Sequence, residues 1–123
     1  MNEYTNKNKY DLEERTSLFG ENIIDLCKII PRNEIISTII KQLIRSATSI
    51  GANYMEANGA SSKKDFRNKI FICKKESQET KYWIRMLARA HDQNSDDLKR
   101  LWQEAKELSM IFHKITSTID NKH

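Results

Sequence analysis

Apolar residues recur along this chain at alternating steps of four and three residues, and the pattern repeats in four separate segments. A helix of 3.6 residues per turn places such positions on one face, whereas a half-buried strand needs strict alternation. Each segment is therefore predicted to be an amphipathic helix with one apolar seam. The four seams cover residues 12–30, 36–57, 66–87 and 98–119.

Short polar segments separate the predicted helices. IPRNE places Pro31 beside the start of the second helix, where a proline is tolerated. NGASSKKD ends the second helix and offers Ser61 or Ser62 as an N-cap for the third, and HDQNSDD offers Ser95 as the N-cap of the fourth. Because short turns make consecutive helices antiparallel, the sequence predicts an all-α, up-down-up-down antiparallel four-helix bundle.

The length of 123 residues, with three glycines and one proline, suits a single helical domain. We expect the bundle to occupy residues 11–123 and residues 1–10 to form a flexible N-terminal segment. The sequence contains neither an apolar run long enough to span a membrane nor a signal-peptide pattern, so a cytoplasmic location is expected. Cys27 and Cys73 lie in apolar helical stretches, which favours reduced, buried thiols.

The stretch RSATSIGANYMEA, residues 45–57, carries glycine and serines although the seam runs through it without a break. Reversal of the chain after the second helix brings this stretch near Glu76 and Glu79 of the third, so an ion pair with Arg45 is predicted. We interpret these side chains as a polar belt that sets helix register, in preference to a catalytic carboxylate pair. The members of the polar belt are Arg45, Ser46, Ser49, Asn53, Glu56, Glu76 and Glu79.

LIRSATSIGANYMEA followed by KKESQETKYWIRML resembles the signature of bacterial four-helix-bundle proteins first known from intervening sequences of 23S ribosomal RNA genes. The resemblance covers about residues 12–119, and its polar signature falls on the polar belt together with Gly51 and Thr80. It implies a ring-like homopentamer without known enzymatic activity. More distantly, it extends to accessory proteins of diversity-generating retroelements, which bind nucleic acid and a reverse transcriptase.

Positive charge is concentrated in residues 63–91, which hold nine bases against three acids, a net charge of +6. Such a surface attracts phosphate backbones without reading sequence, so RNA or DNA is a candidate partner. The alternative is a solvated face whose bases pair with the acids of the first helix. The chain contains no basic run with interleaved aromatics, which argues against sequence-specific groove recognition. The candidate nucleic-acid-binding residues are Lys63, Lys64, Arg67, Lys74, Lys75, Lys81 and Arg85.

No pattern in the sequence supports an enzyme, a cofactor or a metal site. The histidines His91 and His113 lack the Glu-x-x-His spacing of di-iron bundles, no Gly-rich phosphate loop is present, and no catalytic residue is assigned. His91 is expected to be an ordinary helix-end histidine.

Further apolar residues outside the seams favour self-association, or docking of a separate protein partner if the bundle is an interaction scaffold. The alternative is that long helices bury faces wider than one seam. These residues are Ile35, Ile39, Ile44, Phe71, Ile72, Trp83, Met86, Trp102 and Ile111.

Overall fold

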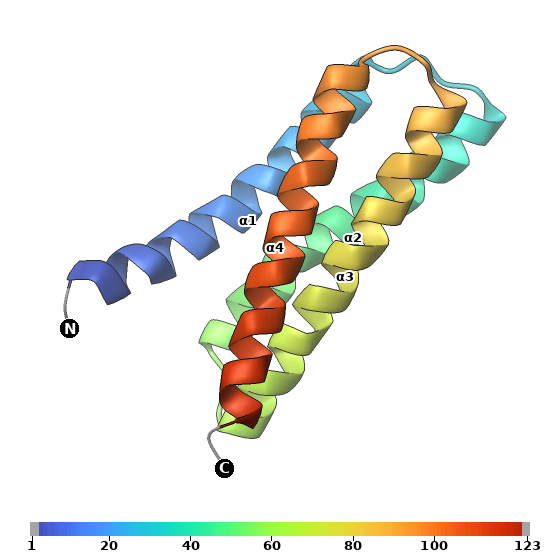
Figure 1. Ribbon diagram of the computed structural model, residues 1–123. Coiled ribbons are helices and arrows are strands. Elements are labelled where there is room, and N and C mark those ends of the chain that lie inside the picture. Colours follow the sequence, from blue (N-terminus) through green and yellow to red (C-terminus); the bar gives the residue numbers. More distant parts are fainter. Residues whose placement is uncertain (1–2, 122–123) are drawn as a thin grey trace.

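The computed structural model describes the backbone of residues 3–121 and the side chains of residues 12–121. Four antiparallel helices, joined by short turns, form an elongated bundle (Figure 1). Their bounds are α1 Glu3–Ile29, α2 Glu34–Asn58, α3 Lys63–Ala90 and α4 Ser95–Asp120. The predicted all-α four-helix bundle is confirmed. Helix α1 begins before residue 11, but the side chains of residues 1–11 lie outside the described part, so the flexible segment 1–10 stays a prediction.

Two helices begin at side-chain caps that satisfy otherwise unpaired backbone N–H groups. Asn33 Oδ1 accepts from the backbone N–H of Ile36 at 2.8 Å at the start of α2. Ser62 Oγ accepts from the N–H of Asp65 at 3.0 Å at the start of α3. Of the two serines proposed as the N-cap of α3, Ser62 is therefore the capping residue.

The expectation that Ser95 caps α4 is wrong. Ser95 is the first residue of the helix, and Asn94 occupies the cap position with φ 59° and ψ 30°, in the left-handed region. No side chain accepts from the first turn of α4 at this cap position. Instead, Asn94 Oδ1 lies 2.9 Å from His91 Nε2, so the asparagine side chain is committed to the end of α3. Asparagine is one of the few residues that tolerates this backbone conformation.

The seams form one continuous core. All seam positions of α1 and α2 are buried, and in α3 and α4 the exceptions are Phe66, Leu101, Ile115 and Ile119, which are half-buried near helix ends or on the edge of the core. Helix α3 packs between α2 and α4, and α1 contacts α2 and α4 but not α3. The α1 and α3 helices are therefore diagonal in the bundle, which decides which charges can meet.

Helices α1 and α2 approach closely at two glycines. A Cβ atom at Gly51 of α2 would lie 3.5 Å from the backbone oxygen and the Oγ1 of Thr16 on α1. A Cβ atom at Gly20 of α1 would lie 3.7 Å from Thr48 Cγ2 on α2. Each glycine thus faces a threonine of the other helix at a distance where an added methyl group makes an ordinary van der Waals contact.

Candidate functional site

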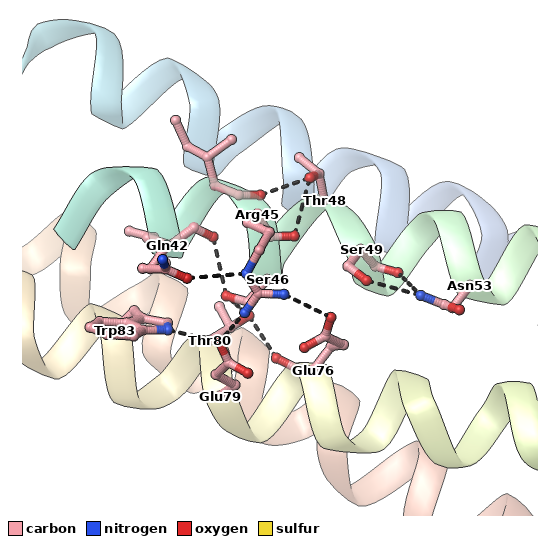
Figure 2. Close-up of polar contacts among 12 residues, drawn as sticks. Gln42, Arg45, Ser46, Thr48, Ser49, Asn53, Glu76, Glu79, Thr80 and Trp83 are labelled. Atoms are coloured by element: carbon pink, nitrogen blue, oxygen red, sulfur yellow. Dashed lines mark hydrogen bonds and ion pairs between the residues drawn. The ribbon is translucent and has the colours of Figure 1, made fainter. Parts of the chain in front are cut away.

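Two hydroxyl groups meet at the centre of the contact between α2 and α3 (Figure 2). Thr80 Oγ1 donates to Ser46 Oγ at 2.9 Å, and Ser46 Oγ donates to the Leu43 carbonyl oxygen at 3.2 Å. Thr80 Oγ1 also lies 2.8 Å from the carbonyl oxygen of Glu76. Both hydroxyl residues are fully buried, and the hydrogen bonds let the helices join without an unsatisfied polar atom at this level.

Arg45 reaches from α2 to two carboxylates of α3 (Figure 2). Its Nη1 lies 3.2 Å from Glu76 Oε2, and its Nη2 pairs with Glu79 Oε2. The predicted ion pair is therefore present, and it involves both carboxylates. The side chain of Arg45 is 47% exposed and that of Glu76 is 12% exposed, so the cluster lies at the rim of the helix contact.

Glu79 accepts a second hydrogen bond, from Trp83 Nε1 at 2.9 Å. This bond, and then the nearby Arg45 guanidinium, hold the pKa of the Glu79 carboxyl below its usual value, against the opposing effect of partial burial. An ionised carboxylate with both kinds of donor around it is poorly placed to exchange protons with a substrate. The arrangement suits attachment of α3 to α2.

Not all of the remaining polar-belt side chains of α2 bond to α3. Asn53 Nδ2 donates to the Ser49 carbonyl oxygen and to Ser49 Oγ, both at 2.9 Å, so these two side chains bond within α2. Ser49 and Asn53 are four residues apart and share one face of the helix. Glu56 does cross, because its Oε1 lies 2.7 Å from Lys69 Nζ of α3. The polar belt is thus a cross-helix cluster around Ser46, a separate ion pair at Glu56 and a local pair on α2.

Three basic residues at seven-residue spacing line the side of α3 that faces α4. Arg67 Nε lies 2.6 Å from Asp120 Oδ1. Lys74 Nζ lies 3.0 Å from His113 Nδ1. Lys81 Nζ lies 5.3 Å from the centroid of the Trp102 ring. We call Arg67, Lys74, Lys81 and the aromatic residues beside them, Phe71 and Trp102, the basic stripe.

The other candidate bases surround this stripe. Lys63, Lys64, Lys75 and Arg85 are exposed, and the charge of Lys75 acts on Glu79. A hollow of about 890 Å³ at the α3 start is lined by Lys63, Lys64 and Arg67 together with apolar Phe66 and Ile119.

No acidic side chain of α1 within residues 12–29, the part of this helix whose side chains are described, forms an ion pair with these bases. Helix α1 has no contact with α3, and its Arg15 pairs instead with Glu104 at 2.7 Å and with Glu107 at 2.8 Å on α4. Among the seven candidate bases, and within the described residues, Arg67 forms an ion pair and the other six form none. The described side chains therefore show no pairing with the first helix, because that helix is diagonal to α3.

The aromatic residues of the basic stripe, Phe71 and Trp102, were predicted only as additional apolar residues and not as neighbours of the bases. Phe71 is 48% exposed, and its ring centroid lies 6.0 Å from Arg67 Cζ and 5.8 Å from Lys74 Nζ. Its spacing of four and three residues from these bases was visible in the sequence. The Trp102 ring has Lys106 as well as Lys81 near it, and Lys106 Nζ is 5.8 Å from the ring centroid. That association joins α3 to α4 and has no local sequence signal.

The additional apolar residues divide into two groups. Ile39, Ile44, Trp83, Trp102 and Ile111 pack against the core, and Ile72 and Met86 are half-buried, which supports the interpretation of wide buried faces. Ile35 and Phe71 are exposed, as are Leu18, Ile24 and Ile29 of α1, which sequence analysis did not single out.

The two cysteines are buried and free, as predicted. Burial raises the pKa of the Cys27 thiol to about 11 and that of Cys73 to about 12. Both thiols are thus inert at neutral pH. Across the described side chains, no three His, Cys, Asp or Glu residues gather in a way that suits a metal ion.

These features define an all-α four-helix bundle with a polar belt between α2 and α3 and a basic stripe beside α4. The chain belongs to the 23S rRNA-intervening sequence protein family, whose model matches residues 8–117. A similar solved structure is that of a protein with unknown function from the S23 ribosomal protein family of Bacteroides thetaiotaomicron VPI-5482. It is 30% identical, with a TM-score of 0.76 over 85% of this chain and 97% of that one.

A search of curated proteins found no match to the chain. None of the four helices, over the residues described, combines the length and apolar character needed to cross a membrane.

Proposed function

We propose that this protein is a cytoplasmic, non-enzymatic homo-oligomer that binds RNA or DNA through the basic face of α3, largely by charge. One observation carries this proposal: six of the seven candidate bases on α3 have no acidic partner among the described residues. Lysine and arginine side chains left unpaired on one helix release counterions from a phosphate backbone when they bind it. Binding of this kind needs no base-specific contact.

Self-association, as a pentamer in line with the family resemblance, would repeat this face around a ring and strengthen its field. Its support is the set of exposed apolar side chains on α1 and at the start of α2, namely Leu18, Ile24, Ile29 and Ile35. A hollow of about 580 Å³ between α1 and α4 is lined partly by Leu18, Ile29 and Leu101. Exposed apolar surface of this kind more often belongs to a protein–protein interface than to a surface that stays in contact with solvent. Light scattering of the purified chain measures its oligomeric state directly.

The test of nucleic-acid binding is titration of a structured RNA across a salt series. We expect binding to weaken steeply as salt rises, and the double variant Lys74→Glu/Lys81→Glu to weaken it at every salt concentration and to reduce the salt slope. The matched control is Lys28→Glu, an exposed charge reversal on α1, the helix that does not contact α3. Absence of binding at low salt, or equal losses in both variants, contradicts the proposal.

A second candidate function is a protein-interaction scaffold without a nucleic-acid role. The observation that favours it is the same exposed group of Leu18, Ile24, Ile29 and Ile35, which fits an apolar protein partner as well as a second copy. Recovery from cells of a stoichiometric partner that survives nuclease treatment, and is lost in Ile29→Asp/Ile35→Asp, supports the scaffold. A homo-oligomer without such a partner contradicts it.

A further inference from the structure

Two aromatic rings in the basic stripe are each flanked by two cations. Phe71 has Arg67 and Lys74 at 6.0 and 5.8 Å from its ring centroid, and Trp102 has Lys81 and Lys106 at 5.3 and 5.8 Å. Nearly half of Phe71 is open to solvent. A positive charge beside an exposed ring offers a stacking surface and a phosphate contact at the same place.

The two rings lie on one continuous stripe. The contacts of Arg67 with Asp120 and of Lys74 with His113 have the same register between α3 and α4, since the sum of residue numbers is constant in an antiparallel pair. The stripe runs from Arg67 to Lys81, about 21 Å at 1.5 Å per residue. Because Asp120 already pairs with Arg67, the lysines at both rings are the cations available to a ligand.

We propose that the basic stripe binds single-stranded nucleic acid, with a base stacked on the exposed ring of Phe71 and the backbone held by Lys74, Lys81 and Lys106. This inference rests on the proposed nucleic-acid binding and specifies its ligand. In a duplex, the faces of the bases are covered by neighbouring bases. An exposed aromatic ring such as Phe71 therefore has no base to stack on, and a duplex can bind the stripe only through its charge. A single strand offers both free base faces and phosphates.

The experiment compares three fluorescently labelled probes at low salt: a 12-nucleotide oligouridine, the matching oligothymidine and a 12-base-pair RNA duplex. Phe71→Leu keeps apolar bulk and removes the aromatic face, whereas Phe71→Trp retains a stacking surface. Tyr82→Leu is the matched control, because Tyr82 is a 53% exposed aromatic residue of α3, and no cation of the described side chains lies over its ring. The two single strands separate RNA from DNA as the ligand.

We expect Phe71→Leu to weaken single-strand binding about 5-fold or more, and Phe71→Trp and Tyr82→Leu to change it little. Duplex binding stays unchanged in all three variants but falls in Lys74→Glu/Lys81→Glu. If Phe71→Leu and Tyr82→Leu behave alike while the charge reversal still weakens every probe, the stacking inference is wrong and the proposed function stands. If no probe binds, both fail.

Discussion

Thr80 of α3 and Ser46 of α2 join the two helices through a hydrogen bond of 2.9 Å between fully buried hydroxyl groups. Each hydroxyl also has a carbonyl oxygen of its own helix within reach, Glu76 for Thr80 and Leu43 for Ser46. The pair therefore favours one relative height of α2 and α3, because a shift of one turn would separate the two hydroxyl groups.

Removal of either hydroxyl should cost about 1 kcal/mol of unfolding free energy, since the remaining partner keeps its backbone acceptor. The single variants are Ser46→Ala and Thr80→Val, measured by urea unfolding. In the double variant we expect a total loss smaller than the sum, with a coupling of ~0.5 kcal/mol or more. Strictly additive losses would show that the two hydroxyls do not act together.

Acid should destabilise the protein partly through Glu79. Because the folded-state pKa of this carboxyl is lowered by Trp83 and Arg45, its contribution is present above the unfolded value of 4.5 and is lost as the pH falls below it. Glu79→Gln keeps an acceptor for the Trp83 indole and removes the titration. We expect a shallower fall of the unfolding free energy between pH 5 and 3 in this variant, and an unchanged slope contradicts the assignment.

Alkali should destabilise the protein through the buried thiols. Their folded-state pKa values, about 11 for Cys27 and about 12 for Cys73, exceed the ordinary value of 9.0, so the unfolded chain loses protons first. Stability is thus fully present below pH 9 and falls as the pH rises through the folded values. Urea unfolding between pH 8 and 11 should show a shallower fall of the unfolding free energy in Cys27→Ala/Cys73→Ala. This slope is separate from the stability that the two truncated side chains lose already at pH 8.

Gly51 tests how tightly α1 packs on α2. A Cβ at this position meets Thr16 at 3.5 Å, an ordinary contact, so Gly51→Ala should fit and raise stability by up to ~1 kcal/mol through helix propensity. Gly51→Leu should lower it by about 1–3 kcal/mol, because the larger side chain pushes against α1. Thermal unfolding of both variants, with Gly20→Ala as the control, measures this. A destabilised Gly51→Ala would mean a closer approach than described.

Much of the fold could be predicted because its signals are local. The apolar seams follow from the helical period, and every predicted seam position of α1 and α2 is buried. Ser62 was among the predicted caps, since an N-cap needs only a short side chain at a helix start. The α4 cap was not predictable in the same way, because Asn94 adopts its backbone conformation while bonding to His91 of the preceding helix.

In the candidate sites, too, some contacts followed from residue spacing and others did not. The Arg45 ion pairs followed from seam spacing and chain reversal, and they are present. Asn53 and Ser49 were expected in the same cluster, but they bond to each other within α2. A small rotation of α2 about its axis decides which residues beside the seam can reach α3.

By itself the sequence determined the helices, their order, the core positions and the concentration of positive charge in residues 63–91, since all of these depend on residue type and spacing along one helix. Only the tertiary structure decided that α1 lies diagonal to α3, which leaves the described acids of the first helix out of reach of those bases. It also brought Lys81 of α3 to the ring of Trp102 on α4. Both depend on which helices pack together and in what register, and that is set by the complementary shapes of all four apolar faces at once.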